Sequence, residues 1–168
     1  MNLRAAIQMD PPESLKFATD STVRIGIEAL RRGHELWYYT PDKLTLLEGN
    51  ITAHASRITF HDNPDHFFNL GESKILDLRE MDVVWLRQDP PFDMGYITTT
   101  YILEQLAPKT LVVNNPAGVR NFPEKIFPTL FRGFMPPTLI SADSAEIHAF
   151  RREDKDIVVK PLYGFAGH

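Results

Sequence analysis

Cysteine is absent from the 168-residue chain. A disulfide bond, a zinc site built on cysteine pairs and a thiol nucleophile are therefore excluded. The first nine residues lack the basic and apolar segments of a secretory signal peptide, and Asp10-Pro11-Pro12 follows them directly. No apolar run approaches the length that crosses a membrane. These absences predict a soluble, cytoplasmic protein with no membrane partner.

Basic charge is also scarce. The chain has 18 Lys and Arg residues against 22 Asp and Glu residues, so its net charge is −4 at pH 7. Because binding to a phosphate backbone requires a basic face, we expect no nucleic-acid partner. Hydrophobic residues make up 43% of the chain and charged residues 24%, which is typical of a folded globular protein. The length suits one domain, or one domain and the start of another.

Several sequence motifs of common enzyme classes are missing. The chain has no Walker A, GxGxxG, HExxH or GxSxG motif, which argues against P-loop NTPases, Rossmann dehydrogenases, metalloproteases and serine hydrolases. His61, Asp62, Asp65 and His66 have the residue types of metal ligands, but a solvated turn explains them better. We therefore predict no metal site and no catalytic residue within this chain.

The first 120 residues alternate between strand-like and helix-like patterns. The expected elements are a strand at 3–8, a helix from Asp20 or Ser21 to about Arg32, a strand at 36–40, a β-hairpin at 44–60, a buried strand at 82–86, a helix at 96–107 and a strand at 110–113. Gly33 is a typical helix C′ residue. Such alternation predicts an α/β fold with an open parallel sheet and an antiparallel hairpin excursion.

The pattern of expected helices and strands changes near residue 120. A short helix at 124–131, a strand at 138–140, a helix at 143–151 capped by Ser141 and a strand at 157–160 are expected after it. We therefore predict two domains, with residues 1–120 as an α/β substrate-binding domain and residues 121–168 as the first part of a second domain.

A charged block follows the buried strand at 82–86. It reads Arg87-Gln88-Asp89-Pro90-Pro91-Phe92-Asp93, and ligands of open α/β sheets bind at the carboxyl ends of the strands. The guanidinium of Arg87 suits a carboxylate or phosphate, and the prolines stiffen the loop that presents Arg87 and Asp89. A surface ion pair in an ordinary loop accounts for the same residues equally well.

Two lysines and a glycine-containing loop suggest a phosphate site. Lys160 ends the apolar run 157–159 and leads into Gly164 and Gly167, whose backbone can approach a ligand closely. Lys125 lies near an expected helix start and could clamp the same polyphosphate, although a single lysine is more often a solvated surface residue. Asp10 and Ser21 lie where the first strand ends and the first helix begins, which suits an anionic group. A plain capped helix explains that location equally well.

Taken in order, these segments resemble the bacterial glutathione synthetase family of the ATP-grasp superfamily. The resemblance covers essentially the whole chain, and its most specific part is the block 87–93. It is carried by Met9-Asp10-Pro11, Asp20-Ser21, residues 28–36, residues 87–93, residues 100–104, residues 113–116, Glu124-Lys125 and Lys160-Pro161-Leu162. One departure is Ala166, which stands where the family commonly has a glycine.

The resemblance implies ATP-dependent ligation of γ-glutamylcysteine with glycine through an acyl phosphate, with ATP and Mg²⁺ as cofactors. It implies that Lys125, Lys160, Gly164 and Gly167 contact ATP. It also implies a pre-ATP-grasp domain at 1–120, in which Arg87, Asp10, Ser21 and Asp89 bind the dipeptide, followed at 121–168 by the truncated first part of an ATP-grasp domain. A homo-oligomer is implied for the complete enzyme.

The magnesium ligands and the glycine site of the family are expected beyond His168. The chain alone is therefore expected to be inactive as a ligase. Two alternatives stay open, namely a non-catalytic binding or assembly module and an ATP-grasp ligase for another carboxylate and amine.

Overall fold

The computed structural model describes residues 2–163. The chain divides into two compact units, which we call unit 1 (Met1–Arg120) and unit 2 (Asn121–His168). Unit 1 combines a seven-stranded sheet with helices, as the sequence predicts for an α/β fold. No helix within residues 2–163 is long and apolar enough to span a bilayer.

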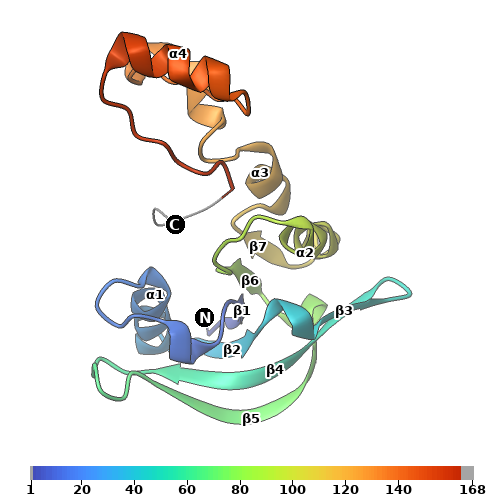
Figure 1. The fold of residues 1–168 in the computed structure, drawn as a ribbon. Helices are drawn as coiled ribbons and strands as arrows, with labels where there is room; N and C mark the ends of the chain where they lie inside the picture. The colour runs from blue at the N-terminus through green and yellow to red at the C-terminus, as the bar shows by residue number, and fades with distance from the viewer. Residues whose placement is uncertain (1, 164–168) are drawn as a thin grey trace. The chain divides into compact units, whose positions relative to one another are not determined.

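The sheet of unit 1 has the order β3-β4-β2-β1-β6-β7, with β5 paired to β4. Parallel pairing joins β1 to β2, β1 to β6 and β6 to β7, whereas β4 pairs antiparallel with β2, β3 and β5 (Figure 1). The sheet is therefore mixed, because the predicted hairpin is hydrogen-bonded into it. The strands are β1 (Arg4–Gln8), β2 (Glu35–Tyr39), β3 (Leu44–Leu47), β4 (Asn50–Phe60), β5 (Phe68–Asp77), β6 (Val83–Leu86) and β7 (Leu111–Val113).

Successive residues of β1 face two separate cores. Ala6 packs in the core that contains Leu103 of helix α2 (Met94–Glu104), whereas Ile7 packs in the core that contains Val23 of helix α1 (Ser21–Arg31). Because the side chains of a strand alternate between its faces, α1 and α2 cover opposite faces of the sheet. This burial on both sides explains the apolar sequence of β6 and the apolar centre of β1, from Ala5 to Ile7.

Helix α1 begins and ends as its sequence predicts. The Asp20 side chain accepts a hydrogen bond from the Thr22 amide at 2.7 Å, which makes Asp20 the N-cap. Gly33 has φ +81°, the left-handed conformation that ends a helix without strain in a residue lacking Cβ. The structure thus resolves the choice between Asp20 and Ser21 as N-cap in favour of Asp20.

The predicted hairpin is confirmed, and a third antiparallel strand joins it. Glu48 and Gly49 have φ values of +47° and +82°, as a two-residue hairpin turn with the twist of its strands requires. The long strand β5 runs beside β4 and was not predicted (Figure 1). Leu76 is its only buried residue, and a strand that is polar and exposed over most of its length lacks the alternation that reveals strands in a sequence.

In unit 2 some predicted elements are wrong. Helix α4 (Ser144–Asp154) is present, but its N-cap is Asp143 rather than Ser141. The predicted helix at 124–131 is instead a kinked 3₁₀ segment, η4 (Phe127–Phe134), which contains Pro128. The helix α3 (Pro116–Asn121), which spans the boundary between the units, was not predicted.

The two strands predicted in unit 2, at 138–140 and 157–160, are irregular in the structure. Val158 and Val159 are 82% and 73% exposed. A strand is stabilised by the hydrogen bonds and side chains of a neighbouring strand, and within residues 121–163 no strand exists to pair with these segments. Their β-branched residues therefore supply strand propensity without the pairing that propensity needs.

Three further 3₁₀ segments link the elements of unit 1. They are η1 (Pro12–Ser14), η2 (Pro41–Lys43) and η3 (Leu78–Glu80). The first follows the exit of β1, so that the chain turns sharply before it reaches α1. Asp10 precedes this segment and lies beside the loop after β6, where its Oδ2 accepts a hydrogen bond from the Asp89 amide.

Candidate functional site

The predicted residue Arg87 lies beside the N-terminus of α1. Its Nε donates a hydrogen bond to Thr22 Oγ1 at 3.0 Å, and its Nη2 donates one to Ser21 Oγ at 2.7 Å. Among residues 2–163, no carboxylate forms an ion pair with Arg87. The alternative that Arg87 is one half of a surface ion pair is therefore wrong. Two hydroxyls orient the guanidinium without neutralising it, which leaves its charge for an anion.

Asp89 and Asp10 meet at the same edge of the sheet. The Asp89 backbone N–H donates a hydrogen bond to Asp10 Oδ2 at 2.8 Å. The parallel ladder between β1 and β6 continues one step further, because the Arg87 amide donates to the Gln8 carbonyl at 2.8 Å. The register of these strands thus joins the loops after β1 and β6, and it brings all four predicted substrate-binding residues together.

Negative charge gathers at the Asp89 end of this cluster. Partial burial raises the pKa of the Asp89 carboxyl, and the nearby carboxylates of Asp10 and Asp20 raise it further, whereas Arg87 acts in the opposite direction. Burial also raises the pKa of the Tyr96 phenol, with Asp89 as the next cause. The cluster is therefore dipolar, with a cation at Arg87 and carboxylates around Asp89.

Two residues of this cluster were missed by the sequence analysis. Thr22 anchors Arg87, and Tyr96 Oη donates to the carbonyl oxygen of Gln88 at 3.5 Å. The sequence does show that Thr22 carries a hydroxyl in the first turn of one predicted helix. It also shows that Tyr96 lies in the first turn of the next. They gain meaning only once the pairing of β1 with β6 is known, because that pairing brings the two helix N-termini to one edge.

The predicted ATP residues belong to unit 2. The half-buried Lys125 donates from Nζ to the carbonyl oxygens of Pro161 and Leu162, at 2.7 and 3.4 Å. Lys160 is exposed and directly precedes this pair. The structure thus brings the Lys125 ammonium to the segment that follows Lys160. Gly164 and Gly167 lie outside the described residues.

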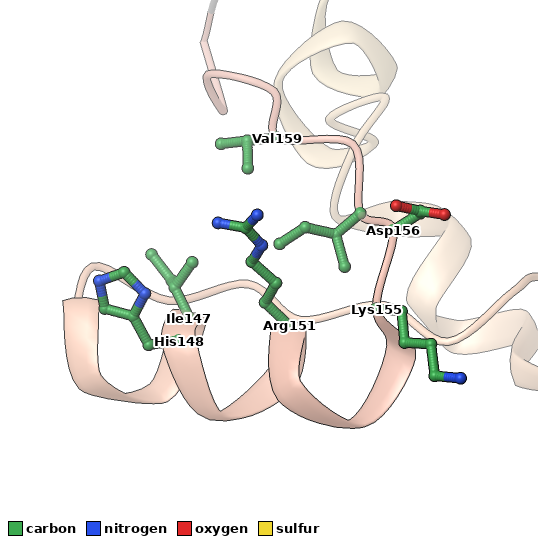
Figure 2. A pocket seen from close by; sticks show the side chains of 7 residues that line it. Ile147, His148, Arg151, Lys155, Asp156 and Val159 are labelled. Atoms are coloured by element: carbon green, nitrogen blue, oxygen red, sulfur yellow. The ribbon is translucent and has the colours of Figure 1, made fainter.

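A surface pocket lies between α4 and the segment that follows it (Figure 2). Its volume is about 370 Å³, and Arg151 extends from the helix toward Val159 across it. The lining residues are Ile147, His148, Arg151, Lys155, Asp156, Ile157 and Val159. None of them is a predicted site residue, and the pocket does not contain the Arg87 cluster.

Magnesium ligands were not predicted within this chain. Over the part that the structure describes, no group of three or more His, Cys, Asp or Glu side chains is arranged to hold a metal ion. We therefore assign no described residue to a metal.

Comparison with known proteins identifies both units. Residues 3–120 match the family described as "Prokaryotic glutathione synthetase, N-terminal domain", and residues 124–168 match "Prokaryotic glutathione synthetase, ATP-grasp domain". The chain is 54% identical over 167 residues to a glutathione synthetase of Mesorhizobium japonicum, an alignment that covers 99% of this chain and 53% of that protein.

More distant relatives show the same coverage. A glutathione synthetase of Escherichia coli O157:H7 is 37% identical over 166 residues, which is 98% of this chain and 53% of that protein. The chain thus spans about half the length of the curated relatives it matches. Because the first family match alone covers well over half of the chain, the chain belongs to the prokaryotic glutathione synthetase family.

Proposed function

We propose that the protein containing this chain joins γ-glutamylcysteine to glycine and consumes ATP. In the first step, a carboxylate oxygen of the cysteinyl residue attacks the γ-phosphorus of ATP, which forms an acyl phosphate and releases ADP. In the second step, the glycine amine attacks the acyl carbon. The amide bond forms, phosphate leaves with the electron pair of the broken C–O bond, and the amine loses one proton.

Unit 1 supplies the dipeptide site in this proposal. The observation that carries it is the cluster in which Arg87 is held by Ser21 and Asp89 is held against Asp10. The glutamyl end of γ-glutamylcysteine has a carboxylate and an ammonium on one carbon, and the cluster presents one cation and several carboxylates. The N-terminus of α1 adds a favourable field for the substrate carboxylate near Arg87.

Unit 2 supplies part of the ATP site. Lys160 is exposed and free to approach a phosphate as a compact charge, while Lys125 holds the following segment through its carbonyl oxygens. Gly164 and Gly167 complete this assignment. ATP contributes the phosphoryl group, and Mg²⁺ would neutralise charge on the phosphates, but the described residues contain no ligand set for it.

We extend the proposal to the setting of the enzyme. The family resemblance supports a cytoplasmic, homo-oligomeric protein. The net charge of −4 supports the absence of a nucleic-acid partner. Its molecular partners are then the two small-molecule substrates and ATP.

The test is a steady-state assay of the complete protein with γ-glutamylcysteine, glycine and ATP. Arg87→Ala should raise the KM for the dipeptide roughly 10- to 100-fold, because a charge-assisted contact is lost, with little change in the KM for ATP. Arg24→Ala is the matched control, since Arg24 lies on α1 and pairs with Asp62 at the surface. An unchanged dipeptide KM in Arg87→Ala would remove Arg87 from the site.

A second variant tests the nucleotide assignment. Lys160→Met should weaken ATP binding in the complete protein, whereas Lys155→Met, an exposed lysine of the same unit, should not. If Lys160→Met binds ATP as tightly as Lys155→Met does, Lys160 is a solvated surface residue and does not belong to the ATP site. Product formation with another acid and amine, but none with γ-glutamylcysteine and glycine, would replace the proposed substrates.

A further inference from the structure

Gln8 is one of the two residues of unit 1 that have a buried side-chain oxygen without a hydrogen-bond partner among the described residues. Gln8 is the last residue of β1 and is fully buried, and its side chain lies on the Ala6 face of the strand, opposite to that of Ile7 and Met9. The Oε1 atom of Gln8 has no hydrogen-bond partner among the described residues. Burial of an amide oxygen without a partner destabilises a fold, so packing alone gives no reason for glutamine at this position.

The amide nitrogen of Gln8, in contrast, has a specific partner. Its Nε2 donates a hydrogen bond to Gln88 Oε1 at 3.0 Å. Gln88 stands between Arg87 and Asp89, and the backbone on either side of it is held at both of those residues. The buried amide therefore reaches one side chain in the loop that carries the candidate dipeptide site.

This contact fixes the amide of Gln88 in one orientation. Its oxygen is occupied by Gln8, so its two Nε2 hydrogens are the groups left for another acceptor. Among the described residues, no acceptor receives a hydrogen bond from Gln88 Nε2. Gln88 is only half-buried, so a bound ligand can reach this donor.

We propose that Gln88 donates a hydrogen bond from Nε2 to an acceptor oxygen of the dipeptide, and that Gln8 is a positioning residue that orients it. The acceptor is a carboxylate or peptide carbonyl oxygen, because Nε2 only donates. This inference rests on the proposed function, and it adds a neutral donor to the charged groups of Arg87 and Asp89. The unpaired Oε1 of Gln8 then destabilises the fold, and this loss is accepted because the same amide supplies the nitrogen that contacts Gln88.

A neighbouring residue provides the control. Tyr39 lies directly opposite Gln8 in the register of β1 and β2, it is 1% exposed, and its Oη also has no hydrogen-bond partner among the described residues. Tyr39 makes no hydrogen bond to Arg87, Gln88 or Asp89 through its side chain. It is therefore a second buried polar residue of the same sheet edge without a link to the candidate site.

The experiment compares Gln8→Met, Gln88→Met, the double variant and Tyr39→Phe in the complete protein. The KM for γ-glutamylcysteine should rise roughly three- to tenfold in each Gln variant, as expected for loss of one hydrogen bond, while the KM for ATP stays unchanged. The double variant should be no worse than Gln88→Met, because both changes remove the same donor. Tyr39→Phe should leave both KM values unchanged.

In Gln8→Met and Tyr39→Phe the Tm should hold or rise, since an unpaired buried atom is removed.

Gln88→Glu tests the donor without any change in the core. The carboxylate still accepts from Gln8 but offers the ligand no N–H, so the dipeptide KM should rise at least as much as in Gln88→Met. A dipeptide KM within twofold of the wild type in Gln88→Glu overturns the proposal, and so does an additive double variant. If the wild type ligates the dipeptide and Arg87→Ala raises its KM while the Gln variants do not, this inference alone fails. If the wild type does not ligate these substrates, the proposed function fails instead.

Discussion

Unit 1 and unit 2 differ in how their apolar residues are used. Every buried hydrophobic residue of the described chain lies in unit 1, between Ala5 and Leu106. In unit 2 large apolar side chains are exposed, with Phe134 at 94% and Leu130 at 74%. Unit 1 encloses two cores around one sheet, whereas the described part of unit 2 combines helical segments with irregular chain.

The difference shows that apolar sequence and local propensity are insufficient for a strand. Residues 83–86 and 157–159 are both short apolar runs, but the first pairs with β1 and β7 and the second is irregular. Pairing satisfies the backbone and buries the side chains on both faces. Where no partner strand is present, the entropy of ordering the backbone is not offset.

Hydrogen exchange should show the largest contrast between the units. Amides of β1 and β6 should exchange at least about 1,000-fold more slowly than those of residues 157–163, because exchange in the sheet requires opening of a packed core. The measurement is amide exchange followed by NMR or mass spectrometry on the chain. Similar protection in both segments would contradict the comparison and would indicate that unit 2 forms a stable core.

Truncation of a buried side chain should have the next largest effect. Ile7 is fully buried, so Ile7→Ala should lower the free energy of unfolding by about 2–5 kcal/mol. Leu130→Ala in unit 2 should change it by less than about 0.5 kcal/mol, and so should the matched control Ile75→Ala, which alters an isoleucine that is 73% exposed in β5. Urea unfolding followed by fluorescence reports on unit 1, because both tryptophans lie there. Equal effects of Ile7→Ala and Leu130→Ala would contradict the comparison.

A glycine-to-alanine substitution should destabilise unit 1 more than unit 2. A Cβ at Gly26 of α1 would lie 2.2 Å from the Phe60 ring, which is itself buried, whereas a Cβ at Gly133 would meet no atom within 4 Å. Gly26→Ala should therefore destabilise unit 1 by about 1–3 kcal/mol despite the better helix propensity of alanine. Gly133→Ala should be neutral within about 0.5 kcal/mol. Thermal unfolding of both variants provides the measurement, and a neutral Gly26→Ala would show that the ring moves freely.

The smallest effects should come from two carboxyl groups of unit 1 that titrate in opposite directions. Hydrogen bonds from Arg31 and Arg32 lower the pKa of Glu28 from 4.5 to about 2. Its contribution to stability is thus present above pH 4.5 and is lost as the pH falls toward 2. Burial and neighbouring carboxylates raise the pKa of Asp89 above 3.8, so stability falls as the pH rises from 3.8 through that raised value.

Carboxyl NMR titration measures both groups, with Glu28→Gln and Asp89→Asn to assign the signals. An Asp89 carboxyl that titrates below 3.8 would show that Arg87 outweighs the carboxylates of Asp10 and Asp20. Asp89 would then be ionised over a wider pH range, and its carboxylate would compensate part of the Arg87 charge that the proposed function assigns to the substrate carboxylate.

Strong local signals made much of unit 1 predictable. The helix at 21–31 has an N-cap, an apolar face and a C′ glycine, and the hairpin at 44–60 has a short turn with glycine between two strand-like runs. The strand β5 was missed because its stability comes from pairing with β4, whereas its own sequence is polar and mostly exposed. The 3₁₀ segment η4 was predicted as an α-helix and helix α3 was not predicted, because proline occurs both at helix starts and in turns.

The candidate site was only partly accessible to sequence reasoning. Arg87, Asp89, Asp10 and Ser21 could be chosen because each follows a strand or begins a helix. Thr22 and the pair Gln8 and Gln88 could not, since their importance depends on which strands are neighbours and on the exact register. A glutamine at the end of an apolar strand gives no sign in the sequence that its nitrogen contacts a residue 80 positions later.

The sequence by itself determined the α/β character of unit 1, the cap and end of α1 and the β3–β4 turn, because each rests on residues close together in the chain. It also determined the family resemblance, through the order of short motifs along the chain. Only the tertiary structure decided the place of β5, the irregular course of residues 157–160 and the meeting of Arg87 with Ser21 and of Asp89 with Asp10. The physical reason is that these features depend on contacts between distant segments. Backbone pairing and desolvation at such contacts outweigh the preferences of individual residues.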